Sequence, residues 1–159
     1  MFKPLLLVFF LLPLFTWSQN DFKPLVLDYT TLAPMLEKNN DTIYLINFWA
    51  TWCKPCIEEL PFFEQVRQDQ FPTPVQVILV SLDFRNQLDS KLIPFLKENK
   101  IKSKVVVLDD SDANSWIDKI DPRWSGALPA TIVYKNEDKR FFPDGFQSYE
   151  AVKEVLVSF

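Results

Sequence analysis

The strongest constraint on the fold is an apolar run, residues 42–50, that is separated by two residues from the first of a pair of cysteines, Cys53 and Cys56. The run is almost entirely β-branched, aromatic and aliphatic, which is typical of a central strand buried on both faces. From residue 54 to about 69, apolar side chains recur every three or four positions, which predicts an amphipathic helix. The pattern therefore predicts a buried strand, a short connection and a helix that begins between the cysteines.

Apolar periodicity in the rest of the chain alternates between strand-like and helix-like segments. This alternation predicts an α/β (α+β) protein with a central sheet flanked by helices. Ser148 is a favourable N-cap for a last helix that would cover the sheet. Further strands are expected at residues 75–82, 105–108, 131–134 and 139–142, and further helices at residues 30–38, 89–99 and 112–120.

The first 18 residues have the three zones of a signal peptide. Lys3 gives a positive start, residues 5–15 form an apolar run, and Thr16-Trp17-Ser18 leaves small residues at the positions that a signal peptidase recognises. A membrane span needs about 20 apolar residues, so this run is short for an anchor. We expect cleavage after Ser18, which leaves residues 19–159 as a single domain in the periplasm or another extracytoplasmic compartment. An uncleaved anchor remains the alternative.

The composition argues against several function classes. The formal net charge is −4 and basic residues are scattered, so a nucleic acid is not an expected partner. The chain has no His and only two Cys, whereas structural zinc needs four such ligands. We therefore expect no metal and no cofactor beyond a redox-active disulfide between Cys53 and Cys56.

The position of the cysteines at the start of a helix favours thiolate chemistry. Unpaired N–H groups and the positive end of the helix dipole stabilise a thiolate at Cys53, and Lys54 adds a cation beside it. Pro55 suits the first helical turn, which needs no N–H donor. Cys56 lies one turn further along the apolar stripe, so we expect it to be the less exposed, resolving thiol. Glu59, three residues on, is the candidate proton acceptor, and a solvated surface position is the alternative for it.

Several separated segments also carry a family resemblance. They are residues 47–56, which read Asn-Phe-Trp-Ala-Thr-Trp-Cys-Lys-Pro-Cys, the segments Glu59-Leu60-Pro61 and Leu128-Pro129-Ala130-Thr131, and Gly145 before the last helix. Together they make the chain similar to the thioredoxin superfamily, and most similar to its exported TlpA-like and ResA-like reductases. The likeness covers about residues 25–159.

The resemblance implies a thioredoxin-like fold with a central mixed sheet. It also implies an extra helix and strand, at residues 89–99 and 105–108, before the proline loop. An X-Pro bond is cis in only about 5% of cases, but the resemblance implies that Pro129 is cis. It further implies that Trp52, Leu128 and Pro129 contact the substrate.

One position departs from plain thioredoxins, which have a buried Asp where this chain has Asn47. An amide cannot accept the proton of the resolving thiol. The role therefore shifts to Glu59, a pattern similar to that of ResA-like members.

The implied activity is thiol-disulfide exchange that reduces protein disulfides, apocytochrome c among them, with a membrane dithiol donor as the second partner. An oxidant or isomerase remains open, because the residues between the cysteines do not fix a reduction potential. A non-catalytic binding module of the same fold is a second alternative. A peroxiredoxin-like peroxidase is a third, although such sites have Thr three residues before the reactive Cys, whereas Thr51 lies two before Cys53.

Overall fold

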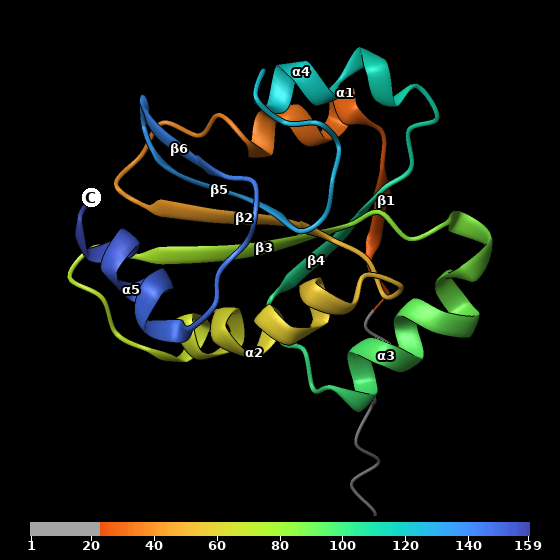
Figure 1. Ribbon diagram of the computed structural model, residues 1–159, viewed down its shortest axis with the longest axis horizontal. Helices are drawn as coiled ribbons and strands as arrows, with labels where there is room; N and C mark the ends of the chain where they lie inside the picture. The colour runs from red at the N-terminus through yellow and green to blue at the C-terminus, as the bar shows by residue number, and fades with distance from the viewer. Residues whose placement is uncertain (1–22) are drawn as a thin grey trace, which may run out of the picture.

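The computed structural model describes residues 23–159, and Figure 1 shows a sheet between two layers of helices. The predicted signal peptide, residues 1–18, lies outside the described residues. Within the described part of the chain, no helix has the length and apolar character needed to cross a bilayer. The main elements, in chain order, are β1 (Leu25–Leu27), α1 (Tyr29–Leu32), β2 (Ile43–Trp49), α2 (Lys54–Gln68), β3 (Val75–Ser81), α3 (Ile93–Glu98), β4 (Lys104–Leu108), α4 (Ile117–Ile120), β5 (Ala130–Lys135), β6 (Asp138–Phe142) and α5 (Tyr149–Val157).

The strands form one mixed sheet in the order β1-β4-β3-β2-β5-β6. The pairs from β1 to β2 are parallel, and β5 runs antiparallel to both β2 and β6. β2 lies in the interior of the sheet and all of its residues are buried, which confirms the predicted central strand. The end of β2 is therefore flanked by the end of β3 and the start of β5.

Alternate residues of β2 face opposite sides of the sheet, and each side has its own hydrophobic core. Leu45 and Trp49 belong to the core that also contains residues of α2, α3 and α5, whereas Ile46 and Phe48 belong to the core with α1 and α4. Figure 1 shows the same division, with α1 and α4 above the sheet and α2, α3 and α5 below it. Asn47 shares the α2 side with Leu45 and Trp49, so it is a polar side chain in an apolar layer.

Two short helices differ from their predicted extent. The sequence pattern predicts a helix over residues 30–38, but α1 is one turn long and continues as a 3-10 turn, Ala33–Met35. Pro34 has no N–H for an α-helical hydrogen bond, which accounts for the change. The helix predicted over residues 112–120 likewise divides into a 3-10 turn, Ala113–Ser115, and α4.

The helix and strand expected before the proline loop are both present. The helical segment starts as a π-helical turn, Leu88–Leu92, and continues as α3. β4 then joins the sheet between β1 and β3. β1 is a strand that the sequence pattern missed, because three residues are too few to show an alternation.

Candidate active site

The two cysteines lie where β2 passes into α2, and they form a disulfide. Cys53 is the N-cap residue of α2, and the backbone N–H of Cys56 donates to Cys53 Sγ over 3.3 Å. Cys53 Sγ thus lies beside the otherwise unpaired N–H groups of the first helical turn, an arrangement that stabilises a thiolate. Cys56 is fully buried, whereas Cys53 is 6% exposed, so the order of exposure is the predicted one.

Lys54 and Pro55 form the first helical positions. Lys54 Nζ lies 3.8 Å from Glu58 Oε1, and the lysine side chain is 88% exposed. Its charge is therefore shared with Glu58 and screened by solvent, so its influence on Cys53 is weaker than the sequence alone suggests. Pro55 lines a small pocket of about 180 Å³ together with Glu59 and Pro129.

A buried carboxylate that was not predicted from the sequence holds the turn between β2 and α2. Asp83 follows β3 directly and is 2% exposed. Its carboxylate accepts hydrogen bonds from the Thr51 backbone N–H, at 3.1 and 3.2 Å, and from Thr51 Oγ1, at 2.5 Å. Ser81 Oγ donates to it as well, over 2.8 Å. The turn that leads to Cys53 is therefore attached to the neighbouring strand.

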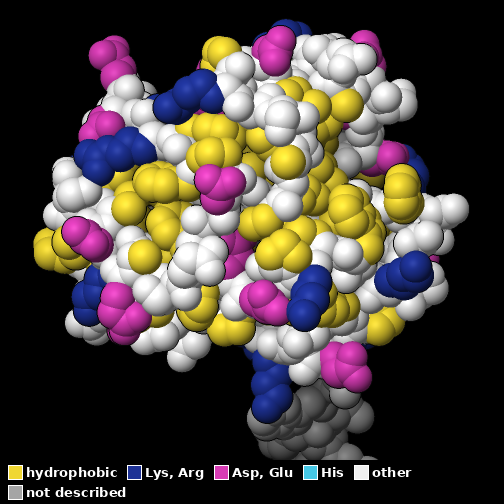
Figure 2. Space-filling model, viewed as in Figure 1, with side chains coloured by type: hydrophobic (Ala, Val, Ile, Leu, Met, Phe, Trp, Pro, Cys, Tyr) yellow, Lys and Arg dark blue, Asp and Glu magenta, His cyan; other side chains and the backbone are white. Residues whose placement is uncertain are grey.

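Two exposed aromatic residues flank this contact. Trp52, which follows Thr51, is 58% exposed, and Phe84, which follows Asp83, is 63% exposed. Exposed hydrophobic side chains mark a binding surface where they form a contiguous patch. Figure 2 shows hydrophobic side chains gathered across the middle of the face that it views, with many of the charged side chains nearer the edge. Trp52 therefore presents an exposed apolar side chain directly before Cys53, and its contact with a substrate stays a prediction.

The proline loop lies against the first turns of α2. The Leu128–Pro129 peptide bond is cis, as the resemblance implies. Gly145 has a positive φ of 66°, and a Cβ there would lie 2.5 Å from Glu59 Oε2 and 2.8 Å from Pro129 Cγ. The absence of a side chain at Gly145 therefore allows its loop to pack closely against both Glu59 and Pro129.

Glu59 is the only one of the predicted site residues with an ionisable carboxyl, and it is almost fully buried, at 2% exposure. Asn47 Nδ2 donates to Glu59 Oε1 over 2.7 Å, and the backbone N–H of Phe146 donates to Glu59 Oε2 over 2.9 Å. Glu59 follows Cys56 by three residues on α2, so the two share one side of the helix. The surface alternative for Glu59 is wrong.

The surroundings of Glu59 raise its pKa from 4.5 to about 7. Burial is the largest cause, because it disfavours the charged form. The hydrogen bonds from Phe146 and Asn47 act in the opposite direction, since they stabilise the carboxylate. A carboxyl with a pKa near 7 can exchange a proton with a thiol at neutral pH.

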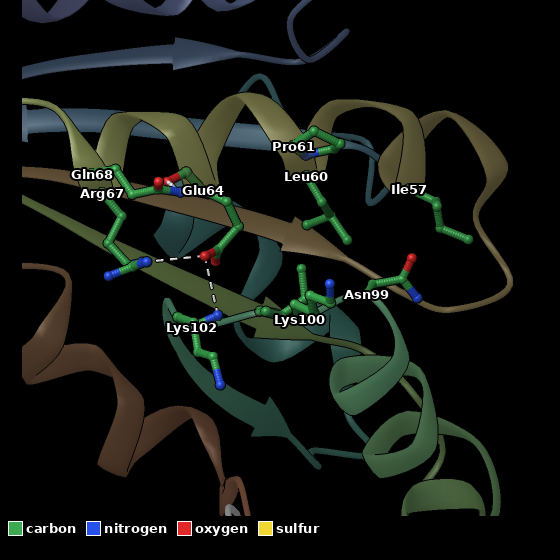
Figure 3. Close-up of a pocket in the computed structure, with 10 residues that line it drawn as sticks. Ile57, Leu60, Pro61, Glu64, Arg67, Gln68, Asn99, Lys100 and Lys102 are labelled. Atoms are coloured by element: carbon green, nitrogen blue, oxygen red, sulfur yellow. Dashed lines mark hydrogen bonds and ion pairs between the residues drawn. The ribbon is translucent and has the colours of Figure 1, made fainter.

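A separate groove of about 430 Å³ runs along another side of α2, and Figure 3 shows its lining. Glu64 reaches from the helix to the facing loop, where its carboxylate accepts the backbone N–H groups of Lys102, over 3.1 Å, and Ser103, over 2.8 Å. Arg67 Nε lies 3.2 Å from Glu64 Oε2. Ile57, Leu60 and Pro61 contribute apolar walls. None of the sequence-predicted site residues lines this groove.

Two further groups of this cluster, a donor and an acceptor, were not predicted from the sequence. The Phe146 backbone N–H comes from a loop far along the chain, and no side-chain type signals it. Thr131 Oγ1 accepts a hydrogen bond from Asn47 Nδ2 over 3.0 Å, and Thr131 is the last residue of the quoted Leu-Pro-Ala-Thr segment. Within residues 23–159, no group of three or more His, Cys, Asp or Glu side chains is placed to hold a metal ion.

Short stretches of the chain are similar to named thiol-disulfide oxidoreductases. The thiol-disulfide oxidoreductase ResA of Oceanobacillus iheyensis is 41% identical over 39 residues, which are 24% of this chain and 20% of ResA. The sporulation thiol-disulfide oxidoreductase A of Bacillus subtilis is 30% identical over 63 residues, which are 40% of this chain and 38% of that protein. The chain thus matches well under half the length of these relatives.

Solved structures match over a larger part of the chain. A thioredoxin-related protein from Neisseria meningitidis superposes with a TM-score of 0.60 at 20% identity, covering 73% of this chain and 84% of that one. A secreted Mycobacterium tuberculosis disulfide oxidoreductase, homologous to E. coli DsbE, gives a TM-score of 0.56 at 17% identity, covering 79% and 86%. These matches show a thioredoxin-like fold. The model of the AhpC/TSA family matches residues 22–139, which is more than half of the chain, and the protein therefore belongs to the AhpC/TSA family.

Proposed function

We propose that this protein is a thiol-disulfide oxidoreductase that reduces disulfides of other proteins. The observation that carries the proposal is the Cys53–Cys56 disulfide at the N-terminus of α2, beside the proline loop and a buried carboxyl. The similarity of short segments to ResA and to the sporulation oxidoreductase supports it.

In the proposed first step, the Cys53 thiolate attacks one sulfur of a substrate disulfide. A Cys53–substrate disulfide forms, and the other substrate sulfur leaves as a thiolate. The N–H groups at the start of α2 stabilise the attacking anion, with a smaller contribution from Lys54. Trp52, Leu128 and Pro129 contact the substrate segment around its disulfide.

In the second step, Cys56 transfers its proton to Glu59 and attacks Cys53 Sγ. The Cys53–Cys56 disulfide forms, and the substrate leaves with both of its sulfurs reduced. Burial raises the pKa of a thiol, so Cys56 needs a nearby acceptor, and Glu59 lies one helical turn away. A membrane dithiol donor then reduces Cys53–Cys56 and completes the cycle.

The proposed compartment is extracytoplasmic, because residues 1–18 have the pattern of a signal peptide. Expression of the full chain with its leader tests this. We expect the exported protein to begin at Gln19, as read by N-terminal mass spectrometry. A protein that keeps residues 1–18 and sediments with membranes would instead support the uncleaved anchor.

Trapping of a substrate tests the assignment of the two thiols. Reduced Cys56→Ser protein, mixed with insulin as a soluble protein disulfide, should accumulate a mixed disulfide at Cys53. The matched Cys53→Ser protein should not. Mass spectrometry of the adduct identifies the sulfur involved, and an adduct that requires Cys56 would reverse the roles. Absence of any adduct with either variant would favour the non-catalytic binding module.

The reduction potential tests the direction of electron flow. We expect a value nearer to about −270 mV than to about −120 mV, the strongly oxidising end for such dithiols. Equilibration with glutathione or dithiothreitol buffers measures it. A strongly oxidising value would identify an oxidant and overturn the proposed reductase.

A hydrogen peroxide assay tests the peroxidase alternative. Thr51 Oγ1 donates to Asp83, which directs this hydroxyl to the neighbouring strand. We therefore expect no peroxide consumption by the protein with dithiothreitol. Consumption that is lost in Cys53→Ser would support a peroxidase instead.

A further inference from the structure

Asn47 occupies a central place in the polar cluster around Glu59. Its Nδ2 donates to Glu59 Oε1 over 2.7 Å and to Thr131 Oγ1 over 3.0 Å, so one amide nitrogen connects α2 with β5. Asn47 is fully buried. Its other polar atom, Oδ1, has no hydrogen-bond partner among the described residues. A buried acceptor without a partner is uncommon and needs an explanation.

The hydrogen bonds of Glu59 suit one protonation state only. An ionised carboxylate accepts hydrogen bonds and donates none, and both partners of Glu59, Asn47 Nδ2 and the Phe146 N–H, are donors. A protonated carboxyl has an O–H that needs an acceptor. Of these two partner groups, only the Asn47 amide also has an acceptor atom, Oδ1.

We propose that Asn47 is a positioning residue whose amide turns by half a rotation as Glu59 gains or loses a proton. With Glu59 ionised, Nδ2 donates to the carboxylate. With Glu59 protonated, Oδ1 takes the place of Nδ2 and accepts the carboxyl O–H. The proton on Glu59 comes from Cys56 under the proposed function, so this inference rests on that function.

Thr131 is suited to both orientations of the amide. A hydroxyl is a donor and an acceptor, so Thr131 Oγ1 accepts from Nδ2 in one orientation and donates to Oδ1 in the other. An aspartate at position 47 could not take the first orientation. It would instead place a second carboxylate beside Glu59, and like charges at short distance oppose ionisation.

Among the groups around Glu59, the Asn47 amide is the hydrogen-bond partner that can change from donor to acceptor. On α2, the titratable neighbours are Cys56 and Glu58, and Glu58 is paired with Lys54. Asp144, from the loop after β6, lines the same small pocket. The strands contribute no charge to this cluster, since β2 supplies Asn47 and β5 supplies Thr131.

Nuclear magnetic resonance of the full chain without its leader tests the proposal. We expect the Asn47 side-chain amide signals to move with pH at the same midpoint as the Glu59 carboxyl carbon. The control is Asn40, whose Nδ2 donates to the Tyr44 hydroxyl over 2.9 Å, and whose signals should not move in this range. Asn47 signals that stay constant while Glu59 titrates would overturn the proposal.

The variant Glu59→Gln sharpens the test. The new Nε2 is a donor beside Asn47, so the amide should be held in its low-pH orientation at every pH, with Oδ1 as acceptor. Asn47 signals at the high-pH position in this variant would contradict the inference. This experiment and the trapping experiment can fail independently. If the Asn47 signals follow the titration of Glu59 but Cys56→Ser traps no substrate, the proposed function is refuted and the amide rotation is not.

The pH dependence of mixed-disulfide resolution distinguishes a positioning role of Asn47 from a purely structural one, because a structural role would leave the pH midpoint unchanged. In Asn47→Leu, we expect resolution of the mixed disulfide to slow about tenfold at pH 7 and its pH midpoint to change, because a charge-assisted hydrogen bond is lost. Asn40→Leu should leave both unchanged. A lower stability of Asn47→Leu with an unaltered pH midpoint would reduce Asn47 to a packing residue.

Discussion

Two carboxylates on the same helix, Glu59 and Glu64, make similar hydrogen bonds in different surroundings. Each reaches from α2 to a loop far along the chain and accepts backbone N–H groups there. Glu59 binds Phe146, and Glu64 binds Lys102 and Ser103. Both carboxylates thus connect the helix to a loop, Glu59 through one backbone N–H and Glu64 through two.

They differ in the charge that accompanies them. Glu64 has the Arg67 guanidinium 3.2 Å away and its side chain is 12% exposed. Glu59 is 2% exposed, and no ion pair of Glu59 occurs within residues 23–159. Its side-chain partner is the neutral amide of Asn47. Burial raises the pKa of Glu59 to about 7, and its two uncharged hydrogen-bond donors lower the pKa too little to cancel this effect.

The largest expected difference between Glu59 and Glu64 is in the rate of disulfide exchange. In Glu59→Gln, we expect resolution of the mixed disulfide to slow by about 100-fold, because a general base is lost. In Glu64→Gln, the same rate should stay within about twofold, since this carboxylate does not face the dithiol. Stopped-flow fluorescence with a dithiol-reactive probe measures both. Equal rates for Glu59→Gln and the wild type across pH 5 to 9 would remove Glu59 from the mechanism.

The next effect is on stability as a function of pH. The folded pKa of Glu59, about 7, lies above the ordinary value of 4.5, so the protonated form favours folding. This contribution is complete below pH 4.5 and is lost as the pH rises through 7. The shift corresponds to roughly 3 kcal/mol, at about 1.4 kcal/mol per pH unit.

Urea unfolding of the wild type and Glu59→Gln at several pH values measures this contribution. The variant should gain in relative stability by roughly 3 kcal/mol between pH 4 and pH 8. Glu58→Gln is the control, because Glu58 is an exposed carboxylate on the same helix. A difference between wild type and Glu59→Gln that does not depend on pH would show that the pKa of Glu59 is the same in the folded and the unfolded chain.

Two residues with positive φ allow the loop that contacts Glu59 and the loop that contacts Glu64 to be compared by substitution. They are Gly145 and Lys100. A Cβ at Gly145 would lie 2.5 Å from Glu59 Oε2, and φ there is 66°. Gly145→Ala should therefore cost about 2 kcal/mol or more and displace Glu59. On the other side, Lys100 already has a positive φ of 54°, so Lys100→Gly should change stability by less than about 1 kcal/mol. Thermal unfolding compares them, and a tolerated Gly145→Ala would mean that the Glu59 loop can shift.

The smallest effect concerns the role of Glu64 as a connection. Glu64→Gln keeps one acceptor oxygen and loses the charge beside Arg67, so we expect a loss of about 1 kcal/mol. Glu58→Gln, which alters only an exposed ion pair, should cost less than about 0.5 kcal/mol. Equal values in urea unfolding would show that Glu64 adds nothing beyond a surface charge.

The parts of the site that could be predicted depend on local patterns. The apolar run before Cys53 identifies the central strand, and the spacing of apolar residues after it identifies α2. Both patterns can be recognised because each lies within one short, continuous segment of sequence. The cis bond before Pro129 was predicted only through the resemblance, since most X-Pro bonds are trans. The place of Glu59 on the same side as Cys56 follows from helical spacing alone.

The parts that could not be predicted depend on contacts between distant residues. The Phe146 N–H that binds Glu59 is a backbone group, which every residue type provides. Asp83 meets Thr51 only because β3 pairs in register with β2. β1 exists because β4 offers it an edge. These contacts depend on the assembled sheet, so the periodicity of a single segment cannot predict them.

The attachment of Thr51 to Asp83 has a further consequence for encounters with other proteins. Ordering a flexible loop during association reduces the affinity of a complex. Here the segment that presents Trp52 is ordered when the sheet forms, before any partner arrives. The entropic cost of complex formation therefore falls mainly on the visiting polypeptide. If the proposed function holds, a flexible, incompletely folded substrate could adapt its shape to this preorganised surface, whereas a rigid substrate would have to match it from the outset.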